Sequence, residues 1–409
     1  MSTKVVVTGV GVVSPVGNDI KTFWDNLCAG KSGIRKVDAF EEIGLNAHIA
    51  GVAEDVHPDG LDKKELRRMS RYSQFAIEAS DQAWKQAGLD MDKLDPFRCG
   101  TIIGSGIGGL KEINEDSVKM EKGGPRRVSP MMVPKGLVNM AAGAVAIRHG
   151  LCGPNKCVVT ACASGTHAIG DAANLIRLGK VDVMVAGGSE ATVFPFGLAG
   201  FCSMRALSTR NDDPEGASRP FDKDRDGFVM GEGAGVMILE SEDHAKARGA
   251  EILGVVAGMG ETCDAHHITA PRPDGSGVSS AMKEGLREAA LNPSGIGYFN
   301  AHGTSTKLND VGECKALQAV FGDDKPLTSS TKSMIGHLLG AAGGVEAIVC
   351  VLSIRDGIIP PNINYETPDP ECQLNLVANE AREAEVSATM SNSLGFGGHN
   401  ASLILTKYG

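Results

Sequence analysis

The sequence predicts an α/β fold in which helices cover both faces of a sheet and the two halves of the chain repeat one another. Short β-branched runs alternate with segments of helical periodicity along the chain. Pairs of glycine-rich segments resemble each other across the two halves. No Pro/Ser-rich linker or low-complexity segment interrupts this alternation.

The individual elements follow in order from these patterns. Strands are expected over 4–8, 99–103, 158–160 and 181–186, where β-branched residues are frequent. Helices are expected over 70–89 and 167–180, where apolar residues recur every three or four positions. A further helix over 241–250 closes the first half of the chain.

Two pairs of segments indicate duplication. "FVMGEGAGVMILES" (228–241) resembles "GFGGHNASLILTKY" (395–408), because each is a glycine-rich turn before an apolar strand. "KCVVTACASG" and "PLTSSTKSMIGHLLGAAGG" both run from a strand through small or hydroxyl residues into a helix of small residues. We therefore expect two halves, 1–250 and 251–409, whose sheets pack through a shared layer of helices.

Composition indicates a closely packed globular protein. Of the 409 residues, 42% are hydrophobic, only 4% are aromatic and 53 are glycine, so aliphatic side chains and close backbone contacts must fill the interior. The ten cysteines include no CxxC pair, which suits reduced thiols. Neither a signal peptide nor the roughly 18 to 20 apolar residues of a membrane helix is found, and a cytoplasmic location is expected.

Charge excludes one class of partner and suggests another. A net charge of -10 argues against general nucleic-acid binding. Locally, "DKKELRRMSR" and "GGPRRVS" are basic. These segments are either solvated faces or a docking patch for an acidic partner.

Cys162 is the first candidate for chemistry. It lies in a turn between an expected strand and an expected helix, flanked by residues too small to block access. A helix N-terminus favours thiolate over thiol, so this position suits a nucleophile, although a buried cysteine is often only a small apolar residue.

Two histidines and a glycine-rich loop complete the candidate site. His302 follows a short apolar segment in "NAHGTSTKLND", and His337 is expected early in a helix within "STKSMIGHLLGAAGG". One cysteine and two histidines so widely spaced match no zinc pattern.

In "SNSLGFGGHN", glycines around Phe396 allow a backbone N–H to point at a developing negative charge. "GSGIGG" lacks the dinucleotide spacing, and "DKDRDGFVMGE" lacks the last ligand of a calcium loop.

Taken together, these segments resemble the β-ketoacyl-acyl carrier protein synthases, most closely the synthase II branch that elongates chains in type II fatty acid synthesis. The motifs are "VVVTGVGVVSPVGN", "GSGIGG", "GPRRVSP", "TACASGTHAIGDA", "DKDRDGFVMGEGAG", "NAHGTST", "SSTKSMIGHLLGAAGG" and "SNSLGFGGHN", in order along essentially the whole chain. The resemblance implies a thiolase-like duplicated α/β/α/β/α layered fold and a homodimer.

The resemblance also implies roles for individual residues. The catalytic group comprises Cys162, His302, His337, Lys332 and Phe396, with Asp310, Glu313 and Glu346 in support. Substrate is expected to contact Thr304, Thr306, Ile107, Phe201 and Thr269, where the two threonines meet the pantetheine arm and Ile107 shapes the acyl pocket. The acidic acyl carrier protein is expected to dock on Arg67, Arg68, Arg126, Arg127 and Arg205. No redox cofactor is implied, and a structural monovalent cation is implied near Asn300, Ala301, Glu346, Ser391 and Asn392.

The implied reaction is a decarboxylative Claisen condensation of acyl carrier protein thioesters through an acyl-Cys162 intermediate. Lys307, where proline is frequent, and His266, where tyrosine is usual, depart from the family pattern and leave the chain-length preference open. A thiolase would carry a second cysteine in the "GFGGHN" loop, and a non-catalytic chain-length subunit would lack the nucleophile. A polyketide ketosynthase shares the chemistry and remains an alternative.

Overall fold

Eleven strands form one continuous sheet in the order β12-β10-β9-β14-β15-β8-β1-β7-β6-β4-β5. The structure is a computed structural model that describes residues 3–409. The strands of the sheet are β1 (Val5–Val13), β4 (Cys99–Gly104), β5 (Asn155–Lys156), β6 (Val183–Glu190), β7 (Gly233–Ser241), β8 (Gly254–Cys263), β9 (Tyr298–Asn300), β10 (Leu327–Ser329), β12 (Asn375–Leu376), β14 (Ala388–Gly395) and β15 (His399–Thr406). Two small ribbons pair β2 (Ile34–Lys36) with β3 (Ile49–Gly51) and β11 (Ile358–Ile359) with β13 (Arg382–Glu383).

The strand order repeats between the halves of the sheet. In the first half β1-β7-β6-β4-β5 and in the second β8-β15-β14-β9-β10, two antiparallel contacts are followed by two parallel ones. The halves meet where β1 pairs with β8 through Val6 with Val255 and Val7 with Gly254. The expected α/β class and the duplication are therefore confirmed, whereas the boundary between 1–250 and 251–409 stays a prediction.

Two helices form the layer shared by the halves. α8 (Ser164–Arg177) contacts β4 and β6, and α14 (Ala342–Asp356) contacts β6, β7 and β14. Every residue of α14 from Ala342 to Ile354 is buried, as expected of a helix with protein on all sides. α4 (Arg71–Ala87) packs on β1 and β7, and α11 (Ser276–Glu288) packs on β8 and β15. The layers are therefore α4, the first half of the sheet, α8 with α14, the second half of the sheet, and α11, which matches the expected five layers.

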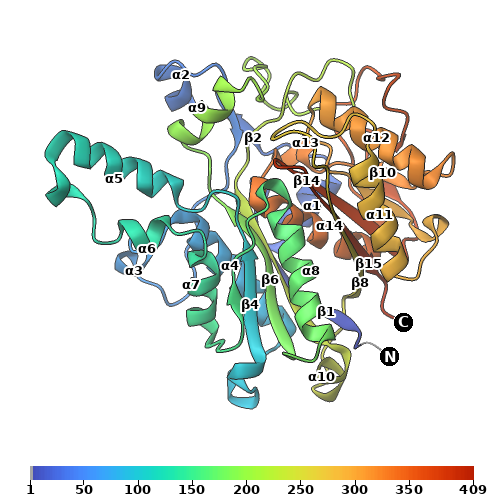
Figure 1. Ribbon diagram of the computed structural model, residues 1–409, viewed down its shortest axis with the longest axis horizontal. Coiled ribbons are helices and arrows are strands. Elements are labelled where there is room, and N and C mark those ends of the chain that lie inside the picture. The colour runs from blue at the N-terminus through green and yellow to red at the C-terminus, as the bar shows by residue number, and fades with distance from the viewer. Residues whose placement is uncertain (1–2) are drawn as a thin grey trace.

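The remaining helices surround this core, and several carry the surface near the site. They are α1 (Ile20–Cys28), α2 (Asp38–Glu42), α3 (Lys63–Leu66), α5 (Leu110–Gly123), α6 (Met132–Gly136), α7 (Met140–His149), α9 (Pro195–Ser203), α10 (Glu242–Ala247), α12 (Lys307–Phe321) and α13 (Lys332–Ile335). The short 3-10 turns include η3 (Pro125–Arg127), η4 (Ala161–Ala163) and η6 (Leu339–Ala341). In Figure 1, α5 projects from the body of the molecule beside α6 and α9.

Two local predictions were wrong. The strand expected over 158–160 does not form, because the β4–β5 ladder ends at Lys156 and Thr160 instead donates its N–H to the Ser164 hydroxyl. His337 does not lie in a helix, because Gly336 ends α13 in a left-handed conformation at φ +72°. The His337 backbone pairs with the segment around Met230 instead, donating its N–H to Val229 O at 2.7 Å.

Within residues 3–409, no helix combines the length and the apolarity needed to cross a lipid bilayer.

Candidate active site

Cys162 lies in the tight turn η4, immediately before α8. Ala161 has φ +51°, an uncommon conformation for a residue with a side chain, and it turns the chain so that Cys162 faces a cavity. Gly395 packs against this turn, because a Cβ there would lie 2.4 Å from Thr160 O and 3.3 Å from Cys162 N. The close approach places the next residue, Phe396, beside the sulfur.

The thiol of Cys162 is protonated in the free protein. Burial raises its pKa to about 12, and the carboxylates of Glu190 and Glu346 add to this, whereas Lys332 and a hydrogen bond from the Phe396 N–H lower it. Burial therefore opposes the expected effect of the helix N-terminus, which favours the thiolate. The sulfur must lose its proton as it attacks, and a base has to lie nearby.

His337 is held as a hydrogen-bond donor toward the cavity. Its Nδ1 accepts the Leu339 backbone N–H at 3.3 Å, so the ring carries its proton on Nε2. The edge of the ring packs on Phe228, with the ring centroids 5.5 Å apart. Burial, and then the charge of Lys332, lower the pKa of His337 well below its usual value, so the ring is neutral.

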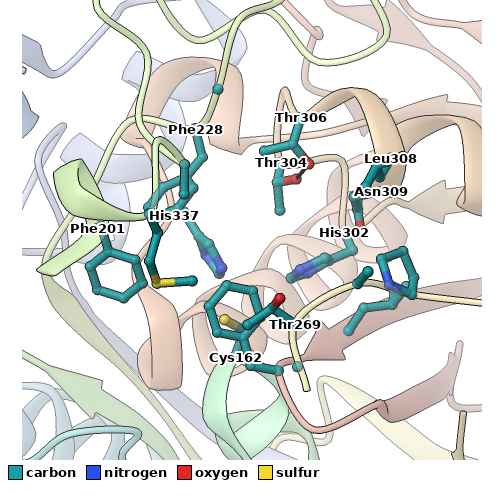
Figure 2. A pocket seen from close by; sticks show the side chains of 18 of the residues that line it. Cys162, Phe201, Phe228, Thr269, His302, Thr304, Thr306, Leu308, Asn309 and His337 are labelled. Carbon is teal, nitrogen blue, oxygen red and sulfur yellow. Dashed lines mark hydrogen bonds between the residues drawn. The ribbon is translucent and has the colours of Figure 1, made fainter. Parts of the chain in front are cut away.

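His302 faces His337 across the cavity, with the ring centroids 5.2 Å apart and the planes nearly perpendicular. Burial, Lys332 and His337 together lower the pKa of His302 well below its usual value. Its Nδ1 is buried and meets no hydrogen-bond partner among residues 3–409, so the protein leaves its tautomer free. In Figure 2 both rings point their nitrogens into the space above Cys162.

Two buried carboxylates of α12 hold the loop that carries His302. Glu313 accepts the backbone N–H groups of His302 at 2.8 Å and Gly303 at 2.9 Å, and burial raises the pKa of Glu313 to about 7. Asp310 accepts the Thr304 N–H at 3.1 Å. These contacts place Asp310 and Glu313 behind the loop, where they position His302 without reaching the cavity.

Lys332 supplies the positive charge that acts on both rings. It forms an ion pair with Glu346, and each side chain is 1% exposed. The pair is close to neutral overall, yet the cationic end lowers the pKa values of both histidines and of Cys162. Lys332 therefore adds to burial, the larger cause, in favouring uncharged imidazoles.

One cavity of about 400 Å³ contains the three reactive side chains (Figure 2). Among the expected substrate contacts, Thr304, Thr306, Phe201 and Thr269 line it, and so do Phe396, Arg205 and Lys307. The Thr304 and Thr306 hydroxyls lie 2.9 Å apart. Ile107 lies outside this cavity, in the apolar cluster that also contains Cys162 and Phe201. The structure thus brings most of the expected substrate contacts together at the cavity, whereas Ile107 lies outside the residues that line it.

The expected cation residues contain unpaired oxygens. Asn300 Oδ1, Glu346 Oε2 and Ser391 Oγ are buried without a hydrogen-bond partner in the part of the chain that the structure describes. Asn300 and Ser391 are cross-strand neighbours in the β9–β14 ladder, beside Ala301 and Asn392. The Asn392 side-chain oxygen already accepts the Ser402 hydroxyl at 2.6 Å. Oxygen donors of this kind fit a monovalent cation.

The expected docking arginines are exposed. Arg67 and Arg68 follow α3, Arg126 and Arg127 lie in η3 after α5, and Arg205 lies at the cavity. The α3 and α6 segments meet where Lys135 Nζ contacts Arg67 O at 3.5 Å. Whether a carrier protein uses these side chains stays a prediction.

Sequence reasoning missed two buried charged residues. Arg225, in the segment tested for calcium binding, is 2% exposed and pairs with Asp310 at 3.3 Å and with Asp369 at 2.6 Å. Glu190, at the end of β6, accepts backbone N–H groups from the "GSGIGG" loop. The available signal for Glu190 was a charged residue at the end of an otherwise apolar strand.

Comparison with known proteins gives concordant matches. Residues 2–245 match the model of the β-ketoacyl synthase N-terminal domain, and residues 253–366 match that of the C-terminal domain. The 3-oxoacyl-[acyl-carrier-protein] synthase 2 of Synechocystis sp. is 48% identical and that of Staphylococcus aureus 49%, each match covering 99% of this chain and 98% of the relative. A type II polyketide ketosynthase solved in complex with its acyl-carrier protein superimposes with TM-score 0.94 at 33% identity over the whole of both chains.

Proposed function

The chain belongs to the β-ketoacyl synthase family, and from this premise we propose how its residues carry out the condensation of acyl and malonyl carrier protein thioesters in fatty acid elongation. The observation that carries the proposal is the convergence of Cys162, His302 and His337 on one cavity. A thiol alone supports acyl transfer, whereas two neutral imidazoles opposite it provide donors for a second developing charge. The products are a β-ketoacyl carrier protein two carbons longer, CO2 and free carrier protein.

In the first half-reaction, the Cys162 sulfur attacks the acyl thioester and the carrier sulfur leaves. The thiol proton must move, and His302, whose tautomer is unconstrained, accepts it and returns it to the departing carrier thiolate. The carbonyl oxygen becomes negative in the transition state. The N–H groups of Cys162 and Phe396 are the donors for this oxygen, and each is worth about 3 kcal/mol by analogy with other oxyanion holes.

In the second half-reaction, the malonyl arm enters the emptied cavity along Thr304 and Thr306. The bond to the carboxylate carbon breaks, CO2 leaves, and the electron pair forms a thioester enolate. His337 Nε2–H, together with His302, stabilises the enolate oxygen. The enolate carbon then attacks the acyl-Cys162 carbonyl, and the Cys162 sulfur leaves and takes up a proton.

The decisive experiment is mass spectrometry of intact protein exposed to acyl carrier protein. We expect the wild type to gain the mass of one acyl group on Cys162 and the Cys162→Ala variant to gain none, because the nucleophile is absent. We also expect the variant to lose elongation by at least about a thousandfold, as removal of a catalytic nucleophile does in other enzymes. Normal elongation by Cys162→Ala would end the proposal.

The pathway and the partner rest on the relatives. Relatives at 48% and 49% identity are named 3-oxoacyl-[acyl-carrier-protein] synthase 2, whereas the type II polyketide ketosynthase solved with its carrier protein is 33% identical. We therefore favour fatty acid elongation over polyketide assembly. The protein works with acyl carrier protein in the cytoplasm, a setting that suits the ten free cysteines.

A homodimer is part of the proposal. The edge strand β5 is exposed, and α7 packs beside it. Val133, Leu137, Ile147 and Val159 are exposed apolar residues on α6, α7 and their flanking segments. An open edge strand with apolar neighbours is a surface that a second copy can cover. Sedimentation velocity at twice the chain mass supports the dimer, and a monomer at micromolar concentration contradicts it.

A monovalent cation is also proposed, held by Asn300, Glu346 and Ser391 near Ala301 and Asn392, with a structural role. We expect the melting temperature to be higher in potassium or sodium chloride than in choline chloride of equal ionic strength. Ser391→Ala removes one ligand and should reduce this difference. An identical melting temperature in all three salts would contradict the site.

A further inference from the structure

Glu190 is a buried carboxylate that contacts two turns. Its side chain is fully buried at the end of β6. Oε1 accepts the Ser105 hydroxyl at 3.0 Å and the N–H groups of Ile107 at 3.2 Å and Gly108 at 3.3 Å. Oε2 accepts the N–H groups of Gly106 at 2.7 Å and Gly340 at 3.1 Å. One side chain thus links the loop carrying Ile107 to the turn that follows His337.

Every group that meets Glu190 is a donor. The Ser105 oxygen receives the Gly108 N–H at 3.2 Å, so the Ser105 hydroxyl hydrogen is free to point at Glu190. A proton on the carboxyl would find no acceptor in this shell. An acceptor with two oxygens is therefore what the site requires, and a carboxylate meets that requirement while an amide does not.

Backbone contacts at this junction are close enough to transmit movement. A Cβ on Gly340 would lie 2.3 Å from Gly106 N and 2.7 Å from Glu190 Oε2. A Cβ on Gly104 would lie 2.3 Å from Ser164 O, in the first turn after Cys162. With no side chains between them, the three segments cannot shift independently.

We propose that Glu190 is a positioning residue that fixes the 105–108 loop and the turn after His337 in one register, so that the wall behind the acyl chain and the decarboxylation site are set together. The inference rests on the proposed function. Ile107 lies in the apolar cluster next to Cys162, outside the open cavity. Glu190 accepts the Ile107 N–H, so it sets how firmly Ile107 is held beside the acyl-Cys162 intermediate.

The test is Glu190→Gln. This substitution keeps the size of the side chain but replaces one carboxylate oxygen with an NH2 donor, which would face the N–H and O–H donors around it. Two rates are measured: acylation of Cys162 by short and long acyl pantetheine thioesters, and CO2 release from malonyl carrier protein. We expect the long-to-short acylation ratio to change by at least tenfold and the kcat of CO2 release to fall by at least tenfold. The matched control is Glu240→Gln, an equally buried carboxylate on β7 that pairs with Arg248 away from the cavity. This control should change neither quantity by more than twofold.

The outcomes separate this inference from the proposed function. A wild type that forms no acyl-Cys162 overturns the proposed function. A folded Glu190→Gln protein in which neither quantity changes, or only one does, overturns the inference alone. If Glu190→Gln does not fold, Ser105→Ala removes one of the five donors. Changes in both quantities then support the inference, and wild-type values for both, or a change in only one, overturn it.

Discussion

At the scale of single residues, the site depends on histidines that stay uncharged. His337 offers an Nε2–H only while its Nδ1 is free to accept the Leu339 N–H. Burial and Lys332 both favour the neutral ring. A protonated Nδ1 would face another donor and release the ring from its position.

This arrangement predicts a flat pH profile for malonyl decarboxylation. A histidine with a lowered pKa gains its proton only when the pH falls well below its ordinary value, so histidine protonation should not lower the rate between about pH 8 and about pH 6, and a fall near pH 7 would instead report Glu313, whose pKa burial raises to about 7. CO2 release in buffers of constant ionic strength measures this profile.

Lys332→Met provides the comparison for that profile. Loss of the cation removes one cause that lowers the pKa values of both histidines, so the acidic fall in rate should move to higher pH. A wild-type fall centred near pH 6.5, or a shift to lower pH in the variant, would contradict the electrostatic argument.

At the scale of elements, strand ends and tight turns deliver the reactive groups to one place. Cys162 precedes α8, His302 follows β9 and Phe396 follows β14. β9 and β14 are parallel neighbours, so the loops after them emerge at the same edge of the sheet. Gly395 then lets the Phe396 loop touch the nucleophile turn.

Gly395→Ala tests this contact. Its Cβ would collide with Thr160 O, so the Phe396 N–H moves away from the oxyanion position. We expect kcat/KM for Cys162 acylation to fall by about a hundredfold, the value of one oxyanion donor. Stopped-flow acylation with a small thioester measures the effect.

Gly200→Ala on α9 is the matched control, because within residues 3–409 no atom other than those of its chain neighbours and the backbone of its own helix lies within 4 Å of the added methyl group. It should leave acylation unchanged and stabilise the fold slightly. Equal rates for wild type and Gly395→Ala would place the oxyanion donors elsewhere.

Several of these elements could be predicted from sequence, and the failures have physical causes. Segments around Cys162, His302, His337 and Phe396 carry local signals, since small residues, glycines and strand ends lie next to one another in the chain. The helix expected at His337 does not form, because Gly336 adopts a left-handed conformation. A glycine in the sequence allows this conformation but does not predict it. The protonated Cys162 thiol depends on burial, which no local pattern reveals.

Glu190 illustrates the same limit over a longer range. Its partners lie 82 to 85 residues away in one loop and 150 residues away in another turn. Only the folded sheet brings these partners together, so the position of Glu190 at the end of a strand does not predict its contacts from the sequence.

At the scale of the whole molecule, charge is divided unevenly. The chain carries a net charge of -10, yet Arg67, Arg68, Arg126 and Arg127 are exposed on α3, η3 and the flanking segments. An acidic carrier protein would be repelled by the net negative charge of the chain and attracted only where these arginines lie close together. Electrostatic attraction of this kind acts mainly on the rate of association.

Reversal of charge at Arg126 and Arg127 to glutamate is therefore expected to raise KM for acyl carrier protein at least tenfold at low salt. Use of a small acyl pantetheine thioester should change less than twofold, because that substrate lacks the acidic surface. Equal losses on both substrates would place the docking surface elsewhere.

The shared cavity also determines the kinetic order of the reaction. Sulfur 162 and both imidazoles open onto one space of about 400 Å³, so the two loaded carriers insert their arms in turn. The enzyme must alternate between a free and a modified form, which is a ping-pong scheme. Double-reciprocal plots at several fixed malonyl concentrations should then be parallel lines, and excess of either substrate should inhibit by occupying the wrong form.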